Sequence, residues 1–269
     1  MIGRVLTIAG SDSGGGAGIQ ADLKTITALG GFGMSAITAL TAQNTLGVSG
    51  VETVSPAFVR QQMRVVLNDL GADCCKTGML ANAGIVHAVA DELQAYSELP
   101  LVLDPVMVST SGSTLLDPEA IEAVMIRLLP CALVVTPNIP EAEVMTGQRI
   151  SGLEDMRAAA HVLQDKGARA VLLKGGHLTG DDLEDLLVLA DGHEIVLRGK
   201  RIRTRHTHGT GCTLASAIAT GIAQGIALEQ AVVRANKFLR LALLHAPELG
   251  KGHGPVNHGV TIRPEWYQS

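Results

Sequence analysis

One segment of the sequence, His206–Thr213 (HTHGTGCT), combines the residue types of an anion-binding turn with a nucleophile or base. Gly209 and Gly211 are separated by one residue, and an apolar run of small residues follows them from Leu214 to Ile226, which predicts a helix. Backbone N–H groups at such a helix start can hold an anion. Cys212 falls in the first turn, where the helix dipole favours the thiolate. The segment predicts phosphoryl transfer; the alternative is a glycine turn before a buried cysteine.

A second glycine-rich segment, Gly10–Gly18 (GSDSGGGAG), follows the first predicted strand and leads into a helix. It resembles a phosphate loop in composition. Its spacing is neither that of a Walker A motif nor that of a dinucleotide-binding fingerprint, and GxxxxGK[ST] occurs nowhere in the chain. The loop could let the backbone approach a small ligand, and Asp12 could cap the helix. Alone, the segment is a weak signal.

Gln43 lies just beyond the second predicted strand. An amide side chain at the end of a strand offers one hydrogen-bond donor and one acceptor to the edge of a heterocycle. Aminopyrimidines and adenine present such an edge. The alternative interpretation is a surface glutamine without a ligand.

Polar residues also follow three later strands. Asp104 comes after one of them, and Asn138 and Glu141 come after the next. Together they could hold a hydrated Mg²⁺, which prefers a few oxygen ligands plus waters and substrate phosphates. Asn138 could also cap the helix that begins near Pro140. Lys174 follows the third of these strands and could reach an ATP phosphate as a point charge.

Short apolar runs alternate with helical stretches along the chain, which predicts an α/β fold with βαβ units and a mainly parallel sheet covered on both faces. The predicted strands are Arg4–Ala9, Met34–Ala42, Cys74–Thr77, Leu101–Leu103, Leu133–Thr136 and Ala170–Lys174. The predicted helices are Ile19–Leu29, Pro56–Leu70, Ala83–Tyr96, Pro118–Leu129, Glu154–Gly167, Cys212–Gln224 and Leu228–His245. Ser55 and Asp117 are expected as N-caps before the first-turn prolines Pro56 and Pro118. Ligands in such sheets bind beyond the carboxyl ends of the strands, where the polar residues above should meet.

The alternation is interrupted by two apolar runs, Leu183–Ala190 and His193–Leu197, which flank Asp191-Gly192 and predict a β-hairpin. Four acidic residues beside it are expected in a solvated loop rather than at a metal: Asp181, Asp182, Glu184 and Asp185. No linker, repeat or low-complexity tract interrupts the chain, so residues 1–269 are predicted to form a single domain.

Composition and cysteine usage argue against several classes of protein. The net charge of −5 disfavours a nucleic-acid partner, and no apolar run is long enough to span a membrane. The N-terminus enters a strand-like segment without a signal peptide, so a cytoplasmic location is expected. Cys74, Cys75 and Cys131 are interpreted as core residues. His206 and His208 have no nearby partners that would complete a zinc site.

Taken together, the motifs resemble the ribokinase superfamily and, within it, the hydroxymethylpyrimidine/phosphomethylpyrimidine kinases of thiamine biosynthesis. The resemblance extends from end to end of the chain, and its motifs are specific in combination although not singly. The segments that carry it are Thr7–Asp22, Ile37–Gly47, Thr77–Leu80, Leu103–Val108, Thr136–Glu141, Leu173–His177, His206–Thr213 and Gly250–His258.

This resemblance implies a ribokinase-like three-layer αβα sandwich, a homodimer, and the use of ATP with Mg²⁺. It implies phosphorylation of 4-amino-5-hydroxymethyl-2-methylpyrimidine and then of its monophosphate, giving the pyrophosphate used for thiamine. The implied site residues fall into four groups. The pyrimidine would be held by Gly10, Asp12, Gln43, Met79 and Val106; ATP by Lys174, Asn138 and Thr207; Mg²⁺ by Asp104 and Glu141 with Asn138; and the anion hole would be Gly209, Thr210 and Gly211, with Cys212 in the base position.

Two departures from the superfamily pattern bear on the substrate. Many sugar kinases of the superfamily carry Asp where this chain has Cys212, which points to the pyrimidine and pyridoxal branch. The loop Ser109–Gly112 lacks the second cysteine of relatives with pyridoxal activity, and it also lacks a lysine often found there. A pyridoxal or pyridoxine kinase is the nearest alternative. A non-catalytic binding protein and a dinucleotide oxidoreductase fit the motifs less well.

Overall fold

The structure of the chain is a computed structural model that describes residues 2–107 and 116–262. The loop Ser109–Gly112, on which one expectation above depends, lies outside these residues. The strands are β1 (Arg4–Asp12), β2 (Phe32–Asn44), β3 (Gly47–Thr53), β4 (Cys74–Thr77), β5 (Leu101–Leu103), β6 (Val134–Val135), β7 (Val171–Leu173), β8 (Asp182–Val188) and β9 (Glu194–Lys200). The α-helices are α1 (Gly18–Ala28), α2 (Pro56–Asp69), α3 (Ala83–Gln94), α4 (Pro118–Ala123), α5 (Ile139–Thr146), α6 (Leu153–Asp165), α7 (Thr210–Ala223) and α8 (Leu228–Leu244).

One sheet of nine strands runs through the described part of the chain, in the order β3-β2-β1-β4-β5-β6-β7-β8-β9. The six strands from β2 to β7 in this order are parallel, and β3, β8 and β9 are antiparallel to their neighbours. The predicted mainly parallel sheet with a hairpin excursion is therefore confirmed. The direction of strand order changes between β1 and β4, which places a ligand-binding switch point beside β1.

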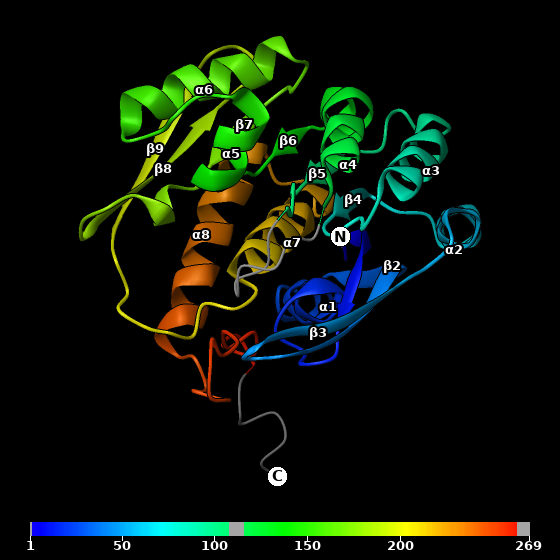
Figure 1. Cartoon of the computed structure of the whole chain (residues 1–269), viewed down its shortest axis with the longest axis horizontal. Coiled ribbons are helices and arrows are strands. Elements are labelled where there is room, and N and C mark those ends of the chain that lie inside the picture. Colours follow the sequence, from blue (N-terminus) through cyan, green and yellow to red (C-terminus); the bar gives the residue numbers. More distant parts are fainter. Residues whose placement is uncertain (1, 108–115, 263–269) are drawn as a thin grey trace.

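Helices cover the two faces of the sheet in separate layers (Figure 1). On one face α2 to α6 pack over a large aliphatic core that includes Leu6, Met63 and Val135. On the other face α1, α7 and α8 enclose a second core around Val5 and Ile218. Adjacent residues of β1 belong to different cores because side chains alternate across a strand. The arrangement is the predicted αβα sandwich.

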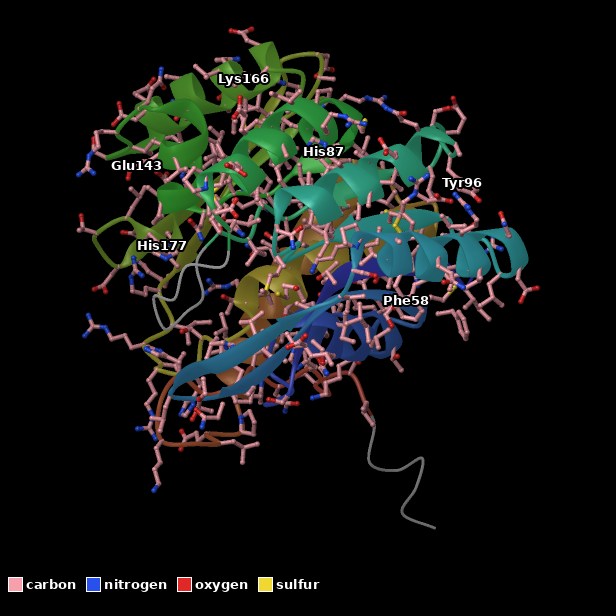
Figure 2. All side chains as sticks on the ribbon, turned by 45° about the vertical axis from the view of Figure 1, so that its right-hand side comes forward. Phe58, His87, Tyr96, Glu143, Lys166 and His177 are labelled. Atoms are coloured by element: carbon pink, nitrogen blue, oxygen red, sulfur yellow. The ribbon has the colours of Figure 1, made fainter. Side chains whose placement is uncertain are left out.

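Several local predictions are correct for the expected reasons. The Ser55 side chain accepts a hydrogen bond from the Phe58 amide, and the Asp117 carboxylate accepts one from the Ala120 amide. Prolines occupy the first turns of α2 and α4. Phe58 itself projects outward from α2 and is half exposed (Figure 2).

The predicted helix Pro118–Leu129 is wrong as one continuous α-helix. α4 ends at Ala123, a π-helical turn follows over Val124–Leu128, and a 3₁₀ turn ends the segment at Cys131. Pro130 lies in that last turn, and its missing amide N–H cannot continue the α-helical pattern. Cys131 is exposed rather than a core residue. The buried thiols of Cys74 and Cys75 lie in opposite cores, as expected.

Strand β3 was not anticipated, because its sequence GVSGVET contains two glycines and only two apolar side chains. It pairs antiparallel with the end of β2, which continues to Asn44 rather than ending at Ala42. The two strands form the long ribbon below the centre of Figure 1.

The acidic residues expected in a solvated loop lie mostly on β8. Asp182 and Glu184 form ion pairs with Lys200 and Arg198 across the hairpin, so the cluster is part of the sheet. Asp185 is half-buried, and its carboxylate accepts hydrogen bonds from the Gly175 amide and the Asn236 side chain. Three arginines follow the end of β9 in irregular backbone: Arg201, Arg203 and Arg205.

Among the described residues, no helix combines the length and apolar character needed to cross a bilayer.

Candidate active site

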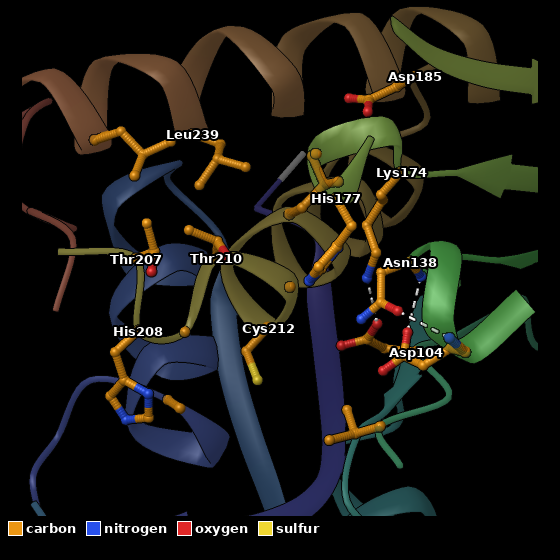
Figure 3. A pocket seen from close by; sticks show the side chains of 18 of the residues that line it. Asp104, Asn138, Lys174, His177, Asp185, Thr207, His208, Thr210, Cys212 and Leu239 are labelled. Atoms are coloured by element: carbon orange, nitrogen blue, oxygen red, sulfur yellow. Dashed lines mark hydrogen bonds and ion pairs between the residues drawn. The ribbon is translucent and has the colours of Figure 1, made fainter. Parts of the chain in front are cut away.

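A cavity of about 630 Å³ opens beyond the carboxyl ends of the parallel strands. The structure places in its lining every residue to which the sequence assigned a role in the site. These are Gly10, Asp12, Gln43, Met79, Asp104, Val106, Asn138, Glu141, Lys174, Thr207, Gly209, Thr210, Gly211 and Cys212. Figure 3 shows Cys212 between the Asp104–Lys174 pair on one side and His208 on the other.

The start of α7 is fixed against the glycine loop that follows β1. Gly209 is the N-cap residue of α7 with a φ of 79°, in the left-handed region that favours glycine. A Cβ atom on Gly209 would lie 1.8 Å from the Gly16 carbonyl oxygen. The Thr213 hydroxyl donates to the Gly209 carbonyl oxygen at 2.8 Å and closes the first turn. The amides of this turn are therefore presented to the cavity by two loops in direct backbone contact.

Cys212 is a thiol in this site, and the expectation of a thiolate is wrong. Burial raises the pKa of its thiol to about 11, against the lowering effect of nearby Lys76. Loss of water around the sulfur disfavours the thiolate. This effect is larger than the stabilisation that one nearby cation and the helix start provide. Burial depends on distant parts of the fold, so a helix-start argument from sequence could not include it.

A cluster of charged groups lies beside the anion-binding turn. The Lys174 Nζ is 3.2 Å from the Asp104 Oδ1, and the Thr136 hydroxyl donates to the same oxygen at 3.0 Å. Burial lowers the pKa of Lys174. The negative charges of Asp104 and then of Glu141 together raise it by a larger amount, so the net pKa is raised and the ammonium form is retained. A Cβ atom on Gly211 would lie 3.4 Å from this Nζ. Glycine at that position brings the cation close to the helix start.

Glu141 and Asn138 cap α5 while facing the same cavity. The Asn138 side chain accepts from the Glu141 amide at 2.9 Å, and a Glu141 carboxylate oxygen accepts from the Asn138 amide at 2.8 Å. This capping box confirms the predicted cap, with the helix beginning at Ile139. Burial raises the pKa of Glu141 to about 7. The charge of nearby Lys174 lowers this pKa, but by less than burial raises it. The Met107 backbone amide also donates to this carboxylate and lowers its pKa.

Asp12 does not cap α1, whose N-cap residue is Ala17. Instead its carboxylate organises the loop before that helix, accepting hydrogen bonds from the amides of Gly14, Gly16 and Ala17. It also lies 2.8 Å from the Nε2 of His208. Gln43 lies beyond His208, with one end of its amide 3.3 Å from the same ring nitrogen.

The cavity also contains residues that the sequence analysis missed. Asp185 of β8 accepts from the Gly175 amide at 2.8 Å and from the Asn236 side chain at 3.1 Å, and so positions the turn that follows Lys174. His177 and Leu239 line the same end of the cavity (Figure 3). The alternation of apolar residues in β8 was visible in the sequence, but which of its faces turns inward depends on the pairing with β7.

Comparisons with known proteins agree with this geometry. The family model described as phosphomethylpyrimidine kinase matches residues 12–257. The chain is 54% identical over 259 residues to the thiamine biosynthesis bifunctional protein ThiED of Geobacter sulfurreducens, covering 95% of this chain but only 52% of that protein. It is 52% identical over 257 residues to the hydroxymethylpyrimidine/phosphomethylpyrimidine kinase of Rhizobium meliloti, covering 94% and 96% of the two chains.

A solved structure extends the likeness to nucleotide complexes. The pyridoxal kinase from Staphylococcus aureus in complex with AMP-PCP and pyridoxal superposes with a TM-score of 0.88 at 35% identity, covering 98% of this chain and 96% of that one. The fold is thus that of the ribokinase-like kinases. With a family model that spans nearly all of the sequence and a relative that is half identical along its whole length, the chain belongs to the phosphomethylpyrimidine kinase family.

Proposed function

We propose that this protein transfers the γ-phosphoryl group of ATP to the hydroxymethyl group of 4-amino-5-hydroxymethyl-2-methylpyrimidine, and then a second phosphoryl group to the monophosphate. The pyrophosphate product serves thiamine biosynthesis. One observation carries the proposal: a single cavity holds the amide of Gln43 and the half-buried cation of Lys174 on either side of the helix start at Gly209–Cys212.

The acceptor is proposed to lie at the Gln43 end of the cavity. The Gly10 backbone and the Met79 side chain form a close floor there, since a Cβ atom on Gly10 would lie 3.3 Å from the Met79 sulfur. Val106 adds an apolar wall. A flat ring seated on these residues would present its polar edge to the Gln43 amide and its hydroxymethyl group to Cys212.

ATP is proposed to lie at the opposite end, with its phosphates near Lys174 and Asn138 and with Thr207 beside the nucleotide. A Staphylococcus aureus relative is described in complex with AMP-PCP, which supports the binding of a nucleotide. Amides of Gly209, Thr210 and Gly211 would face the charge that develops on the transferring group. In a loose transition state such positioning and charge neutralisation provide most of the catalysis.

Mg²⁺ is proposed to bind with the nucleotide, through Asp104 and Glu141. Both carboxylates are buried and face the cavity, and the Lys174 Nζ contacts the Oδ1 of Asp104. Within residues 2–107 and 116–262 no three His, Cys, Asp or Glu side chains gather as an all-protein metal site requires. The donor set therefore fits a hydrated Mg²⁺ that takes its other ligands from phosphates and water. When bound, the ion neutralises phosphate charge.

Cys212 is proposed to accept the proton of the hydroxymethyl group late in the first transfer. Because its pKa is raised to about 11, only a small fraction is thiolate at neutral pH. The second acceptor is a phosphate monoester with a pKa of about 6, which is already ionised and needs no base. The two phosphorylations therefore make different demands on this residue.

The test is ATP turnover by the purified protein with Mg²⁺, comparing the aminopyrimidine with pyridoxal and resolving mono- and diphosphate products. We expect conversion of the pyrimidine to its pyrophosphate and weaker turnover of pyridoxal. Preferred turnover of pyridoxal would instead assign the chain to vitamin B6 salvage. Turnover of neither compound would contradict the proposal and favour a binding protein on a kinase scaffold.

Pyridoxal remains the second candidate substrate because a structural relative is described in complex with it. Both compounds are flat heteroaromatic rings that bear a hydroxymethyl group. Gln43 favours the aminopyrimidine, because pyridoxal has no amino group to pair with the amide oxygen. A Gln43→Met variant that keeps full activity on the pyrimidine would contradict this preference.

A homodimer is proposed for the assembly, and a cytoplasmic location stays a prediction. Apolar side chains of the β2–β3 ribbon support an interface there, since Leu40 and Val51 are each about half exposed. Light scattering coupled to gel filtration tests the dimer. A Leu40→Glu variant should run as a monomer if the ribbon forms the interface, and an unchanged dimer would place the interface elsewhere.

A further inference from the structure

The segment 175–180 (GGHLTG), which follows β7 and Lys174, is a turn with little conformational preference of its own. Three of its residues are glycines, and Gly180 has a φ of 109°. Glycine loses more conformational freedom on folding than any other residue, so such a turn needs outside contacts to keep one conformation. The turn is part of the site, because Gly176 and His177 line the cavity beside Lys174.

One side chain from the end of the neighbouring hairpin holds this turn. The Arg201 guanidinium donates from Nε to the Gly180 carbonyl oxygen and from Nη1 to the Gly176 carbonyl oxygen, both at 2.8 Å. Its Nη2 donates to the Leu178 carbonyl oxygen at 2.5 Å. All three nitrogens thus have carbonyl partners in one turn. A planar guanidinium with fixed N–H directions can hold these acceptors in a set arrangement.

The position of Arg201 is itself fixed by the hairpin. Its backbone amide donates to the Asp181 carbonyl oxygen at 2.8 Å, directly beyond the last residue pair of β8 and β9. At the other end of the turn, the Gly175 amide donates to the Asp185 carboxylate at 2.8 Å. The hairpin therefore holds the start of the turn through Asp185 and the rest of it through Arg201.

The contacts of Arg201 differ from those of the basic residues near it in the sequence. Arg198, Lys200 and Arg203 each form an ion pair with an acidic residue of the hairpin. Within residues 2–107 and 116–262 the guanidinium of Arg201 has carbonyl partners and no carboxylate partner. Its charge reaches the cavity wall, since burial, then Lys174, then Arg201 lower the pKa of His177. Arg201 therefore serves the turn rather than the pairing of the two strands.

We propose that Arg201 is a positioning residue for the nucleotide: its guanidinium holds the turn 175–180 in the conformation that receives ATP. The inference rests on the proposed function, which places the phosphates near Lys174, and adds a residue that the motifs do not include. With Arg201 in place, the turn is ordered before the nucleotide arrives. Without it, only a fraction of the molecules would have the competent conformation, and the apparent Kd would rise by the inverse of that fraction.

The experiment measures the Kd of AMP-PCP with Mg²⁺ by isothermal titration calorimetry, without the pyrimidine. Arg201→Met should raise this Kd at least about tenfold. Arg201→Lys keeps the charge but lacks the three-way fork, so it should raise the Kd as well. The matched control is Arg203→Met, which removes an equal charge from an exposed pair with Asp181 and should change the Kd by less than about twofold. A variant that is merely less stable would bind at fewer sites per chain with the native Kd.

Hydrogen exchange gives a second readout that does not involve the nucleotide. Backbone amides of the segment 175–180 should exchange at least about tenfold faster in Arg201→Met than in the native protein, because the turn opens more often. An unchanged Kd or unchanged exchange in Arg201→Met would overturn the inference. Native binding by Arg201→Lys would also overturn it, since charge alone would then be sufficient.

The same measurements distinguish this inference from the proposed function. Native protein that neither binds AMP-PCP nor phosphorylates the pyrimidine would overturn both. Native protein that does both, while the Arg201 variants bind AMP-PCP equally well, would overturn only the role of Arg201.

Discussion

Lys76 and Asp22 form an ion pair that is closed off from solvent. The Lys76 Nζ lies 2.9 and 3.0 Å from the two carboxylate oxygens of Asp22, and neither side chain has exposed surface. Hydroxyls of Thr7 and Ser216 donate to the same carboxylate. The pair thus joins β1, α1 and β4 to α7, one turn beyond Cys212.

Breaking this pair should be costly. Lys76→Met is expected to lower the free energy of unfolding by about 3–5 kcal/mol, because it leaves a buried carboxylate without its cation. Denaturant unfolding measures the change. The matched control is Lys200→Met, which breaks an exposed pair with Asp182 and should have no measurable effect. Equal effects of the two substitutions would show that the buried pair is not closed off in solution.

The contact between the two glycine loops should be essential for catalysis. Gly209→Ala is expected to lower kcat by at least about 10²-fold, because the new Cβ would force the start of α7 away from the Gly16 carbonyl and misplace the anion-binding amides. Gly147 has a similar φ of 74° but no atom within 4 Å of its Cβ position. Gly147→Ala should therefore lose stability without losing kcat. Similar losses of kcat in both variants would mean that backbone strain, not the loop contact, is responsible.

Removal of the thiol should separate the two phosphorylations. Cys212→Ala is expected to slow the first step by about 10²–10⁴-fold, the usual contribution of a general base, and to affect the second step far less. Single-turnover assays started from the pyrimidine or from its monophosphate measure the steps independently. Equal losses in both would rule out a role for Cys212 in accepting the hydroxymethyl proton.

The raised pKa of Cys212 predicts a difference in pH dependence. If the thiolate is the base and its pKa is about 11, the first step should accelerate about tenfold per pH unit between pH 7 and 9.5. The second step should be nearly flat over this range, because its acceptor is already ionised. Cys212→Ala should remove the slope of the first step. A first step as flat as the second in the native protein would contradict the assignment.

His258 should make the protein sensitive to mild acid. Burial, followed by the charge of Lys24, lowers the pKa of this histidine from 6.5 to about 4, so the folded state disfavours its protonation. Its contribution to stability is complete above pH 6.5 and is lost as the pH falls towards 4. At pH 4.5 the loss should be about 2–3 kcal/mol relative to pH 7.5.

The measurement is urea unfolding at both pH values for the native protein and for His258→Gln, which can keep the hydrogen bond to the Thr213 hydroxyl. The variant should lose less stability on acidification. His193→Gln changes an exposed histidine and is the control. If acid destabilises His258→Gln as much as the native protein, the buried imidazole is not the acid-sensitive group.

The strands of the parallel sheet, and the position of polar residues at their carboxyl ends, could be predicted from the sequence because both follow from local patterns. Asp104, Asn138 and Lys174 each come just after an apolar run, and a parallel sheet brings such positions to one edge. β3 could not be predicted in this way, because its glycine-rich sequence becomes a strand only when the edge of β2 is present.

Contacts between distant segments account for the other errors. The pairing of Asp12 with His208 joins residues 196 positions apart, so nothing in the sequence near Asp12 distinguished it from a helix cap. The raised pKa of Cys212 has the same origin, since the groups that bury its sulfur come from several elements. Helix-start arguments describe the local field correctly but omit the loss of solvent.

The contact of Gly16 with Gly209 also has a consequence for synthesis of the chain on the ribosome. The loop that contains Asp12 and Gly16 is synthesised early. Its partners, His208 for the Asp12 carboxylate and Gly209 for the Gly16 carbonyl, and the amides that would hold phosphate are present only once α7 has been made. Within the described part of the chain, all nine strands precede that helix in the sequence. Because β9 ends at Lys200 and α7 begins at Thr210, a nascent chain completes its sheet only shortly before this turn, and its site is assembled late in synthesis.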